Sequence, residues 1–419
     1  MAPAALGSDF AAVCGQALAA ADVPGAAVGV LHRGGQWTGG FGVTERGGGI
    51  PVRPETTFRV ASVSKPFTAT LALSLAGSRV LDFAEVVPAP APGVTVRHLL
   101  AHLCGFESEC GDLARFGEGD DALARLAAEL QRQRQRQLVA PGELWSYCNA
   151  GYWLLAHILE ERSGTSYESA LAERVLRPLG LRATTFGEPD TAGHDPHPQR
   201  PYYPRARRPS GGLTSNVSDL LAFARFHLEA SATAALRAPA AVTPGGSYGY
   251  GLMLEPVGKL RLWGHVGSWG GYESRLFFEP EHAFAFVALA NSGAAGAVLR
   301  DLQDAAVERV LGVRRVPAET VPVPAERLAL LAGRYVGAEA EVAFSVESGG
   351  LRVDATAIAP DGTRTRQEPT HARPLGERLF EIVGGDRRGS RFDFHPAAGD
   401  PRFVRFGSRL ASRREGAQL

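Results

Sequence analysis

The sequence predicts an α+β protein: an antiparallel sheet flanked by helices lies beside an all-helical lobe, and a small β-barrel follows. Three observations lead to this fold class. Strand-like apolar segments occur near residues 26–44 and return after residue 260, whereas the chain between them is rich in helical periodicity. A proline-punctuated stretch then leads into short alternating runs. The length of 419 residues also exceeds what one ordinary core accommodates, so we expect at least two domains.

The first half of the sheet is expected near the N-terminus. Apolar periodicity over residues 10–21 predicts a helix, which the Pro24–Gly25 break ends. Two alternating runs, 26–31 and 36–43, flank the turn residues 33–35. This arrangement predicts a β-hairpin.

Later segments supply the helical lobe and the second half of the sheet. Residues 151–161 place leucine and isoleucine on one helical face, and residues 165–168 have the spacing of a capping box. Residues 274–278 and 283–289 predict two strands, and the helix expected over 298–311 covers the sheet that they join.

The C-terminal part has the pattern of an all-β domain. Short alternating runs, such as residues 342–346 and 379–383, stand between glycine and proline breaks. We therefore expect a first domain over residues 1–315, a linker over 316–326 and a small antiparallel barrel over 327–419.

Charge and hydropathy exclude several classes of partner. The 44 basic and 44 acidic residues give a net charge of zero, which offers no electrostatic footprint for nucleic acid or an anionic membrane. No stretch reaches the roughly 18 apolar residues of a membrane span, and residues 1–9 lack the basic and apolar regions of a signal peptide. We expect a cytoplasmic protein.

The four cysteines are scattered, and only Cys104 and Cys110 are spaced to form a bridge. In a reducing compartment they are expected to be free thiols. His102, Cys104 and Cys110 form too loose a cluster for a metal site. The sequence therefore predicts no metal and no cofactor.

Ser62 and Lys65 form the most informative motif. Lys65 is one of only two lysines in a chain that otherwise uses arginine, and arginine cannot exchange a proton near neutral pH. A spacing of three puts both side chains on one face of a helix start, where a lysine amine can take the serine proton. A solvated lysine beside a capping serine is the alternative interpretation.

Tyr147 and Asn149 form a second candidate motif. A tyrosine beside a lysine ammonium is drawn toward the phenolate and can act as a general base and then an acid. The Asn149 amide can hold both the lysine and a substrate carbonyl. A core tyrosine followed by a turn asparagine explains the same residues without chemistry.

The third motif is His265-Val-Gly267-Ser268. Gly267 allows backbone to approach a substrate closely, so the N–H of Ser268 can pair with that of Ser62 as an oxyanion hole. His265 would face the same cleft as a donor or proton carrier. A glycine-rich strand turn with a structural histidine is the alternative.

Together the three motifs resemble those of the serine β-lactamase and penicillin-binding-protein superfamily, in its class C-like branch of esterases and D-aminopeptidases. Further family-like segments are residues 99–105, 145–152 and 210–215. The resemblance implies a β-lactamase/transpeptidase-like first domain in which Ser62 is the acylated nucleophile and Lys65 and Tyr147 activate it. A catalytically silent protein would be expected to lose one of these residues.

One departure from the family's motifs narrows the class of substrate that we expect. The family's third motif carries a lysine where this chain has His265, which disfavours a β-lactamase or DD-carboxypeptidase. The layout is most similar to penicillin-binding-protein-type thioesterases, which release nonribosomal peptides by head-to-tail cyclisation and carry a lipocalin-like barrel. A cytosolic carboxylesterase or a D-aminopeptidase/amidase is the alternative.

That resemblance implies a peptidyl thioester substrate, delivered by a carrier protein of a peptide synthetase. Trp145 and Trp269 are candidate walls of the cleft, as is Trp153, for which core packing is an equal alternative. One barrel arginine would hold a substrate carbonyl. The candidates are Arg402, Arg405 and Arg409, although ordinary surface arginines explain them as well.

Overall fold

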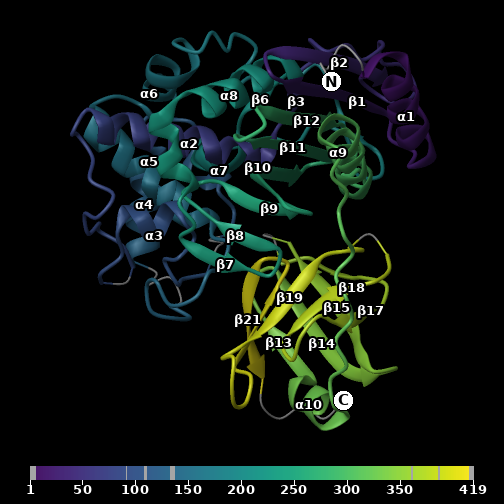
Figure 1. The fold of residues 1–419 in the computed structure, drawn as a ribbon. Helices are drawn as coiled ribbons and strands as arrows, with labels where there is room; N and C mark the ends of the chain where they lie inside the picture. The colour runs from purple at the N-terminus through teal and green to yellow at the C-terminus, as the bar shows by residue number, and fades with distance from the viewer. Residues whose placement is uncertain are drawn as a thin grey trace.

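A computed structural model of the chain describes residues 6–90, 92–107, 111–132, 137–359, 362–385 and 387–414. Figure 1 shows a large body of sheet and helices with a β-barrel packed below it. The barrel lies against the end of the sheet formed by the short strands β7 and β8 (Figure 1). The predicted fold class is confirmed.

The large body is built on an eight-stranded antiparallel sheet in the order β2-β1-β12-β11-β10-β9-β8-β7. The bounds are β1 Gly25–His32, β2 Gly35–Gly42, β7 Ala241–Thr243, β8 Gly246–Tyr248, β9 Met253–Val257, β10 Leu260–Trp269, β11 Tyr272–Glu279 and β12 Phe284–Ala290. Pairing of β1 with β12, for example Val28 with Ala288, joins the two ends of this body. Both strands are fully buried, because helices cover both faces of the sheet.

Two terminal helices cover one face of the sheet. They are α1 Gly7–Ala20 and α9 Gly296–Leu311, and they enclose a core that includes Phe10 and Phe286. On the other face lies α8 Val217–Glu229, which approaches so closely that a Cβ at Gly29 would lie 2.3 Å from the Val217 side chain. Beyond it is the helical lobe (Figure 1), formed by α2 Ser64–Gly77, α3 Val96–Leu100, α4 Ala122–Arg132, α5 Asn149–Ser163, α6 Tyr167–Leu171 and α7 Arg208–Gly211.

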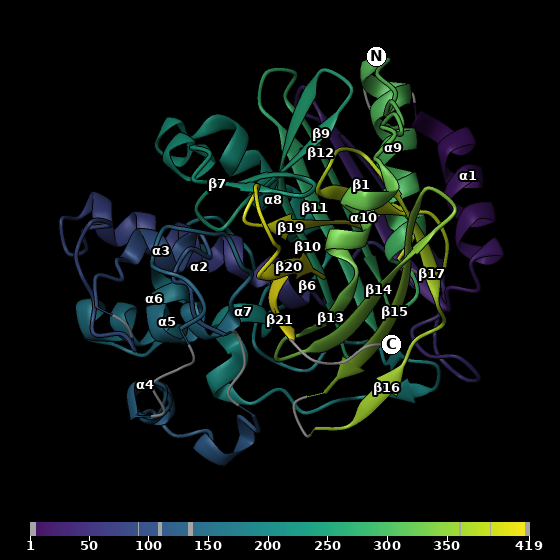
Figure 2. The same ribbon diagram turned by 90° about the horizontal axis from the view of Figure 1, so that it is seen from below.

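The C-terminal barrel closes through eight antiparallel strands, which Figure 2 shows from below. The ring is β13 Gly333–Val336, β14 Ala340–Glu347, β15 Gly350–Ile358, β17 Thr370–Pro374, β18 Leu379–Ile382, β19 Arg391–His395, β20 Phe403–Phe406 and β21 Arg409–Arg414. A short strand, β16 Arg364–Arg366, pairs with β15, and α10 Ala325–Leu331 precedes the ring. Phe344, Phe380 and Phe392 stack inside it, so aromatic side chains fill its interior.

Local details differ little from the expected pattern. The cap of α6 is Ser166, whose hydroxyl accepts the N–H of Ser169, and not Thr165 as the capping-box spacing suggested. Cys104 is a free thiol, whereas Cys110 lies outside the described residues.

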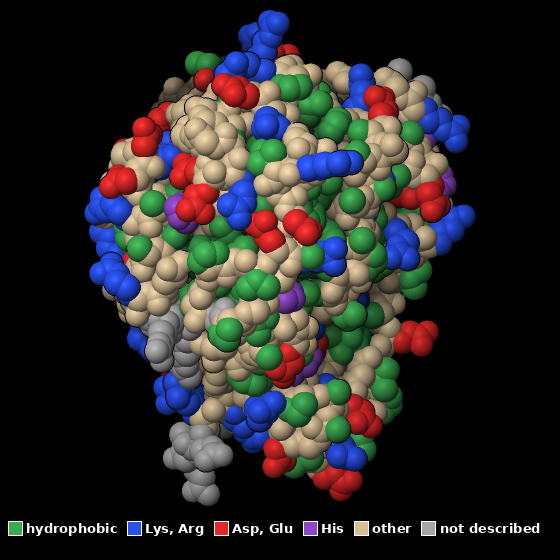
Figure 3. All heavy atoms as spheres, turned by 90° about the vertical axis from the view of Figure 1, so that its left-hand side faces the viewer, with side chains coloured by type: hydrophobic (Ala, Val, Ile, Leu, Met, Phe, Trp, Pro, Cys, Tyr) green, Lys and Arg blue, Asp and Glu red, His purple; other side chains and the backbone are tan. Residues whose placement is uncertain are grey.

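Figure 3 shows basic and acidic side chains interspersed over the face that includes the helical lobe, consistent with a net charge of zero. Within the described residues, no helix has the length and apolar character needed to cross a membrane.

Candidate active site

Ser62 and Lys65 lie where a short 3-10 turn, Ala61–Val63, runs into α2. Lys65 is completely buried, and its Nζ donates to Ser62 Oγ at 3.2 Å and to the Ser210 carbonyl oxygen at 2.6 Å. Ala61 has a φ of +44°, a strained conformation for a residue with a side chain. The structure therefore brings the buried amine to the serine hydroxyl, as the spacing predicted.

The third motif lies directly beside this turn. A Cβ on Gly267 would lie 2.3 Å from the Val60 carbonyl oxygen and 2.9 Å from the Ser62 nitrogen, so only glycine fits. The hydroxyl of Ser274, on the neighbouring strand β11, donates to the same Val60 oxygen at 2.7 Å. Ser268 follows on β10 and is exposed. β10 thus passes the Ser62 amide at Gly267, which places the candidate oxyanion-hole residue Ser268 next to this contact.

Tyr147 lies over the lysine amine. Its ring centroid is 4.7 Å from Lys65 Nζ, and its buried hydroxyl makes no hydrogen bond within the described structure. Burial raises the pKa of Tyr147, while the nearby Ser62 hydroxyl and the Arg409 charge oppose that rise. This shift is opposite to the one that a resting phenolate requires. The raised pKa favours the neutral phenol, which is suited to donate a proton first.

Asn149 begins α5, two residues after Tyr147, and is partly buried. The same helix carries Trp153, which is fully buried and donates its indole N–H to Ser210 Oγ at 2.8 Å. Since the Ser210 carbonyl accepts from Lys65, this serine links α5 to the lysine. Trp153 is therefore a structural residue and not a wall of the cleft.

His265 belongs to a directional hydrogen-bond chain behind the site. The N–H of Cys148 donates to His102 Nδ1 at 3.0 Å, so His102 donates from Nε2 to the Tyr248 hydroxyl at 3.1 Å. Tyr248 then donates to His265 Nε2 at 3.1 Å, and His265 Nδ1 donates to the Val266 carbonyl at 2.5 Å. Burial lowers the pKa of His265 to about 3. The neutral ring has both nitrogens engaged, which leaves none for the proton-carrier role suggested by the sequence.

The barrel contacts the segment that carries Tyr147. The Tyr147 N–H donates to the Ser408 carbonyl at 2.9 Å, and the Leu410 N–H donates to Ser146 Oγ at 3.2 Å. Buried Arg405 donates to the Trp145 carbonyl at 3.2 Å. Ser408 lies in the tight turn between β20 and β21 and belongs to no recognisable sequence motif. Sequence reasoning therefore missed this contact.

The three barrel arginines named from the sequence have different positions. Arg409 lies over Tyr147, with its Cζ 5.1 Å from the ring centroid, and pairs with Glu339 at 2.8 Å. Arg405 lies behind the site in a bidentate pair with Asp393. Exposed Arg402 lies over the ring of Phe403. Arg409 is thus the one whose guanidinium contacts the candidate catalytic tyrosine.

The two remaining tryptophan candidates, Trp145 and Trp269, also have different positions. Trp145 is 3% exposed and packs against Tyr147 and Tyr248, so it supports the tyrosine from behind. Trp269 is half-buried at the end of β10 and packs edge-to-face on Tyr203 with ring centroids 4.6 Å apart. Trp269 is therefore the better candidate for a cleft wall.

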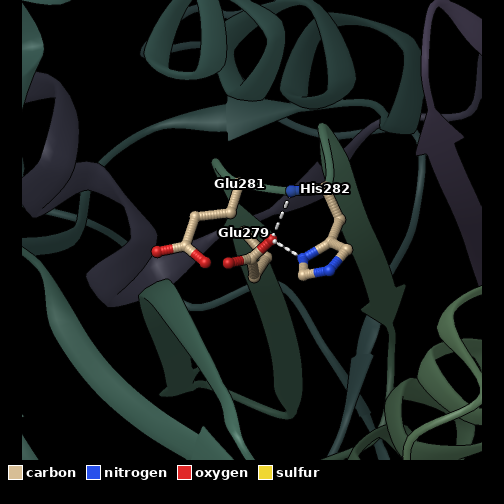
Figure 4. A group of neighbouring side chains, drawn as sticks. All are labelled: Glu279, Glu281 and His282. Carbon is tan, nitrogen blue, oxygen red and sulfur yellow. Dashed lines mark hydrogen bonds and ion pairs between the residues drawn. The ribbon is translucent and has the colours of Figure 1, made fainter.

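Glu279, Glu281 and His282 form a group of potential metal ligands in the turn between β11 and β12 (Figure 4). Glu279 Oε2 accepts the backbone N–H of His282 at 2.7 Å and its Nδ1 at 2.8 Å, so this carboxylate closes the turn. The turn is at the end of β11 remote from Ser274. It does not belong to the candidate active site.

Residues 10–309 match the family model described as Beta-lactamase. The chain belongs to the beta-lactamase family. Penicillin-binding protein 4 of Amycolatopsis lactamdurans is 31% identical over 365 residues, which cover 75% of this chain and 93% of that protein. This relationship and the family match identify the chain as a beta-lactamase-family serine hydrolase.

Two further similarities bear on specificity. A D-aminopeptidase of Brucella anthropi is 28% identical over 327 residues, covering 71% of this chain but only 60% of that longer protein. The crystal structure of SurE with D-Leu superimposes with a TM-score of 0.73 at 25% identity, covering 97% of this chain and 99% of that one. The match to SurE thus includes the barrel as well as the catalytic body.

Proposed function

We propose that the protein is a serine acyltransferase or hydrolase that forms an acyl-enzyme on Ser62. The observation that carries this proposal is the 3.2 Å contact between the fully buried Lys65 amine and Ser62 Oγ. A lysine excluded from water and placed on a serine hydroxyl is suited to proton transfer rather than to surface charge.

In the proposed reaction, Ser62 Oγ attacks the donor carbonyl while a neutral Lys65 takes its proton. The Ser62 and Ser268 amides stabilise the oxyanion. The proton passes through Tyr147 to the leaving group, which departs as the free thiol or amine. A nucleophilic amine or water then attacks the ester, loses its proton through Tyr147, and the Ser62 hydroxyl is restored.

For the substrate, we infer a peptidyl thioester that ends in a D-residue and is released by head-to-tail cyclisation. The full-length similarity to SurE, crystallised with D-Leu, and the D-aminopeptidase relative both support a D-configured acyl group. The neutral, fully engaged His265 supplies no cation for the carboxylate of a β-lactam. Cyclisation prevails over hydrolysis if the cleft excludes water and holds the amine close. We further propose that a carrier protein delivers the thioester in the cytoplasm.

A D-aminopeptidase or D-amidase is the second candidate, favoured by the Brucella relative. It would use the same acyl-enzyme with water as the acceptor. An esterase is the corresponding candidate for oxygen esters.

The test offers peptidyl pantetheine thioesters that differ only in a C-terminal D- or L-residue and weighs the products. We expect the D-substrate to lose pantetheine without gaining water, and Ser62→Ala to form no product. Linear acid alone would indicate a hydrolase and contradict cyclisation. Cleavage of D-amino acid amides without thioester turnover would favour the second candidate, and labelling by a fluorescent penicillin would favour the β-lactam-reactive branch.

A further inference from the structure

A cavity of about 400 Å³ lies between the catalytic body and the barrel. One wall comes from β7 to β11 and α9, and the other comes from β18, β19, β20 and the turns beside them. Among the described residues that line it are neither Ser62 nor Tyr147. The cavity is therefore distinct from the candidate active site, although Trp145, which lines it, packs against Tyr147.

The charges around the cavity are predominantly positive. Arg275 and Arg315 line it and both pair with Glu255, the carboxylate on the same wall. Arg391 lines the barrel side and pairs with Glu381 at 3.2 Å. These three arginines are thus neutralised by acids within the protein.

Two more arginines on the lining have no such acid in the part of the chain that the structure describes. Arg387 extends from the barrel with its Cζ 4.9 Å from the Phe406 ring centroid, and its guanidinium makes no hydrogen bond or ion pair with any described residue. Burial lowers its pKa, which shows that the site is unfavourable for an isolated charge. Arg300, on α9, donates to the Arg388 carbonyl at 2.9 Å and forms no ion pair within the described chain. Each part of the molecule therefore contributes one guanidinium that has no acidic partner among the described residues.

A third donor and an apolar surface complete the lining. The indole N–H of Trp145 is buried, and the described structure offers it no acceptor. Buried donors without acceptors are uncommon in folded proteins and often mark a missing partner. The apolar part of the wall is formed by Met253, Val266, Phe277, Phe392 and Phe406.

We propose that this cavity binds an organic oxyanion, a molecule with one carboxylate or phosphate group attached to an apolar body. The planar guanidinium forks of Arg387 and Arg300 match the oxygens of either group. The aromatic and aliphatic wall takes the apolar body. This site does not depend on the reaction at Ser62, and its ligand bridges the two parts of the molecule.

Calorimetric titration of the full chain with phenyl phosphate, phenylacetate and neutral phenol tests the proposal. At least one anion is expected to bind more tightly than phenol, and the tighter anion identifies the group as phosphate or carboxylate. Arg387→Gln and Arg300→Gln should each weaken that binding about tenfold or more. Equal binding of phenol, no binding of either anion, or wild-type affinity in either variant overturns the proposal.

Arg388→Gln is the matched control, because Arg388 is exposed, pairs with Asp301 and does not line the cavity. Its affinity for the anion should equal that of the wild type, and a tenfold loss would assign the effect to general charge. Without ligand, Arg387→Gln should unfold at the same or a higher temperature, because it removes a buried charge that has no acidic partner among the described residues. A lower unfolding temperature would show a structural role and contradict the assignment.

Discussion

The backbone N–H of Tyr147 donates to the Ser408 carbonyl oxygen at 2.9 Å, across 261 positions of the sequence. This bond joins the candidate proton-transfer residue to the turn between β20 and β21 of the barrel. Because the Tyr147 ring also lies over Lys65 Nζ, this hydrogen bond connects the position of the phenol above the amine to the barrel. The barrel is thus part of the site's framework.

Loss of Arg405 should loosen this framework. Arg405 is buried, forms a bidentate pair with Asp393 and donates to the carbonyls of Trp145 and Val242. Arg405→Ala removes the bidentate partner of the largely buried Asp393 carboxylate and leaves it the contact with His395 Nε2 at 3.2 Å. Breaking a buried pair of this kind typically costs about 3–5 kcal/mol. Denaturant unfolding should show this loss, and kcat should fall more than KM rises. Arg402→Ala is the control. Wild-type stability and kcat in Arg405→Ala would show that the contacts of Arg405 do not support the site.

Replacement of Lys65 by arginine should remove the base while it keeps the charge. Arginine does not release its proton at any pH at which the protein is folded, so the Ser62 hydroxyl loses its acceptor. We expect kcat to fall about 10²–10⁴-fold. Lys259→Arg, at the only other lysine, controls for general effects of the exchange. A Lys65→Arg variant with near wild-type kcat would move the base elsewhere.

A side chain at Gly267 should displace the serine turn. The added Cβ would meet two backbone atoms, the Val60 oxygen at 2.3 Å and the Ser62 nitrogen at 2.9 Å, which cannot rotate away. A shift of about 1 Å at the nucleophile costs about 100-fold in rate. Gly77→Ala is the control, since nothing lies within 4 Å of its Cβ and alanine favours the end of α2. Equal kcat/KM for Gly267→Ala and wild type would contradict the close packing.

Glu273 should make stability depend on pH. It pairs with Ser268 across β10 and β11, and burial raises its pKa from the ordinary 4.5 to about 8. The folded protein therefore binds this proton more tightly than the unfolded chain does. The contribution is fully present below about pH 4.5 and is lost as the pH rises through about 8.

Glu273→Gln keeps the neutral form at every pH. Its unfolding temperature relative to the wild type should therefore increase between pH 5 and pH 9, a range chosen to bracket the raised pKa of about 8. Thermal unfolding of both proteins in matched buffers measures the difference. A difference that stays constant or reverses over this range would show that Glu273 does not carry the proton.

The sequence predicted those parts of the site that depend on short-range spacing. Ser62 and Lys65 meet because residues three apart share a helical face, and Gly267 lies where only glycine fits. The alternating runs also predicted the barrel. The expected fold class followed from the order of these segments.

Other features depend on tertiary contacts that no local pattern encodes. Tyr248 links His102 to His265 only because the sheet places β8 next but one to β10, with β9 between them. No sequence motif marks Tyr248. The pKa of Tyr147 rises because the barrel and helical lobe exclude water, whereas the sequence showed only a tyrosine expected near a lysine. The docking of the β20–β21 turn on residues 145–147 is likewise a property of the assembled fold.

The central claim is that Ser62 becomes acylated, and intact-protein mass spectrometry during turnover tests it directly. Mixed with a peptidyl pantetheine thioester and quenched in acid, the wild type should gain the mass of the acyl group, and peptide mapping should locate it on Ser62. Ser62→Ala should gain no mass, whereas Ser64→Ala should still be acylated if it folds. Acylation of Ser62→Ala, or turnover by that variant at the wild-type rate, would contradict the account.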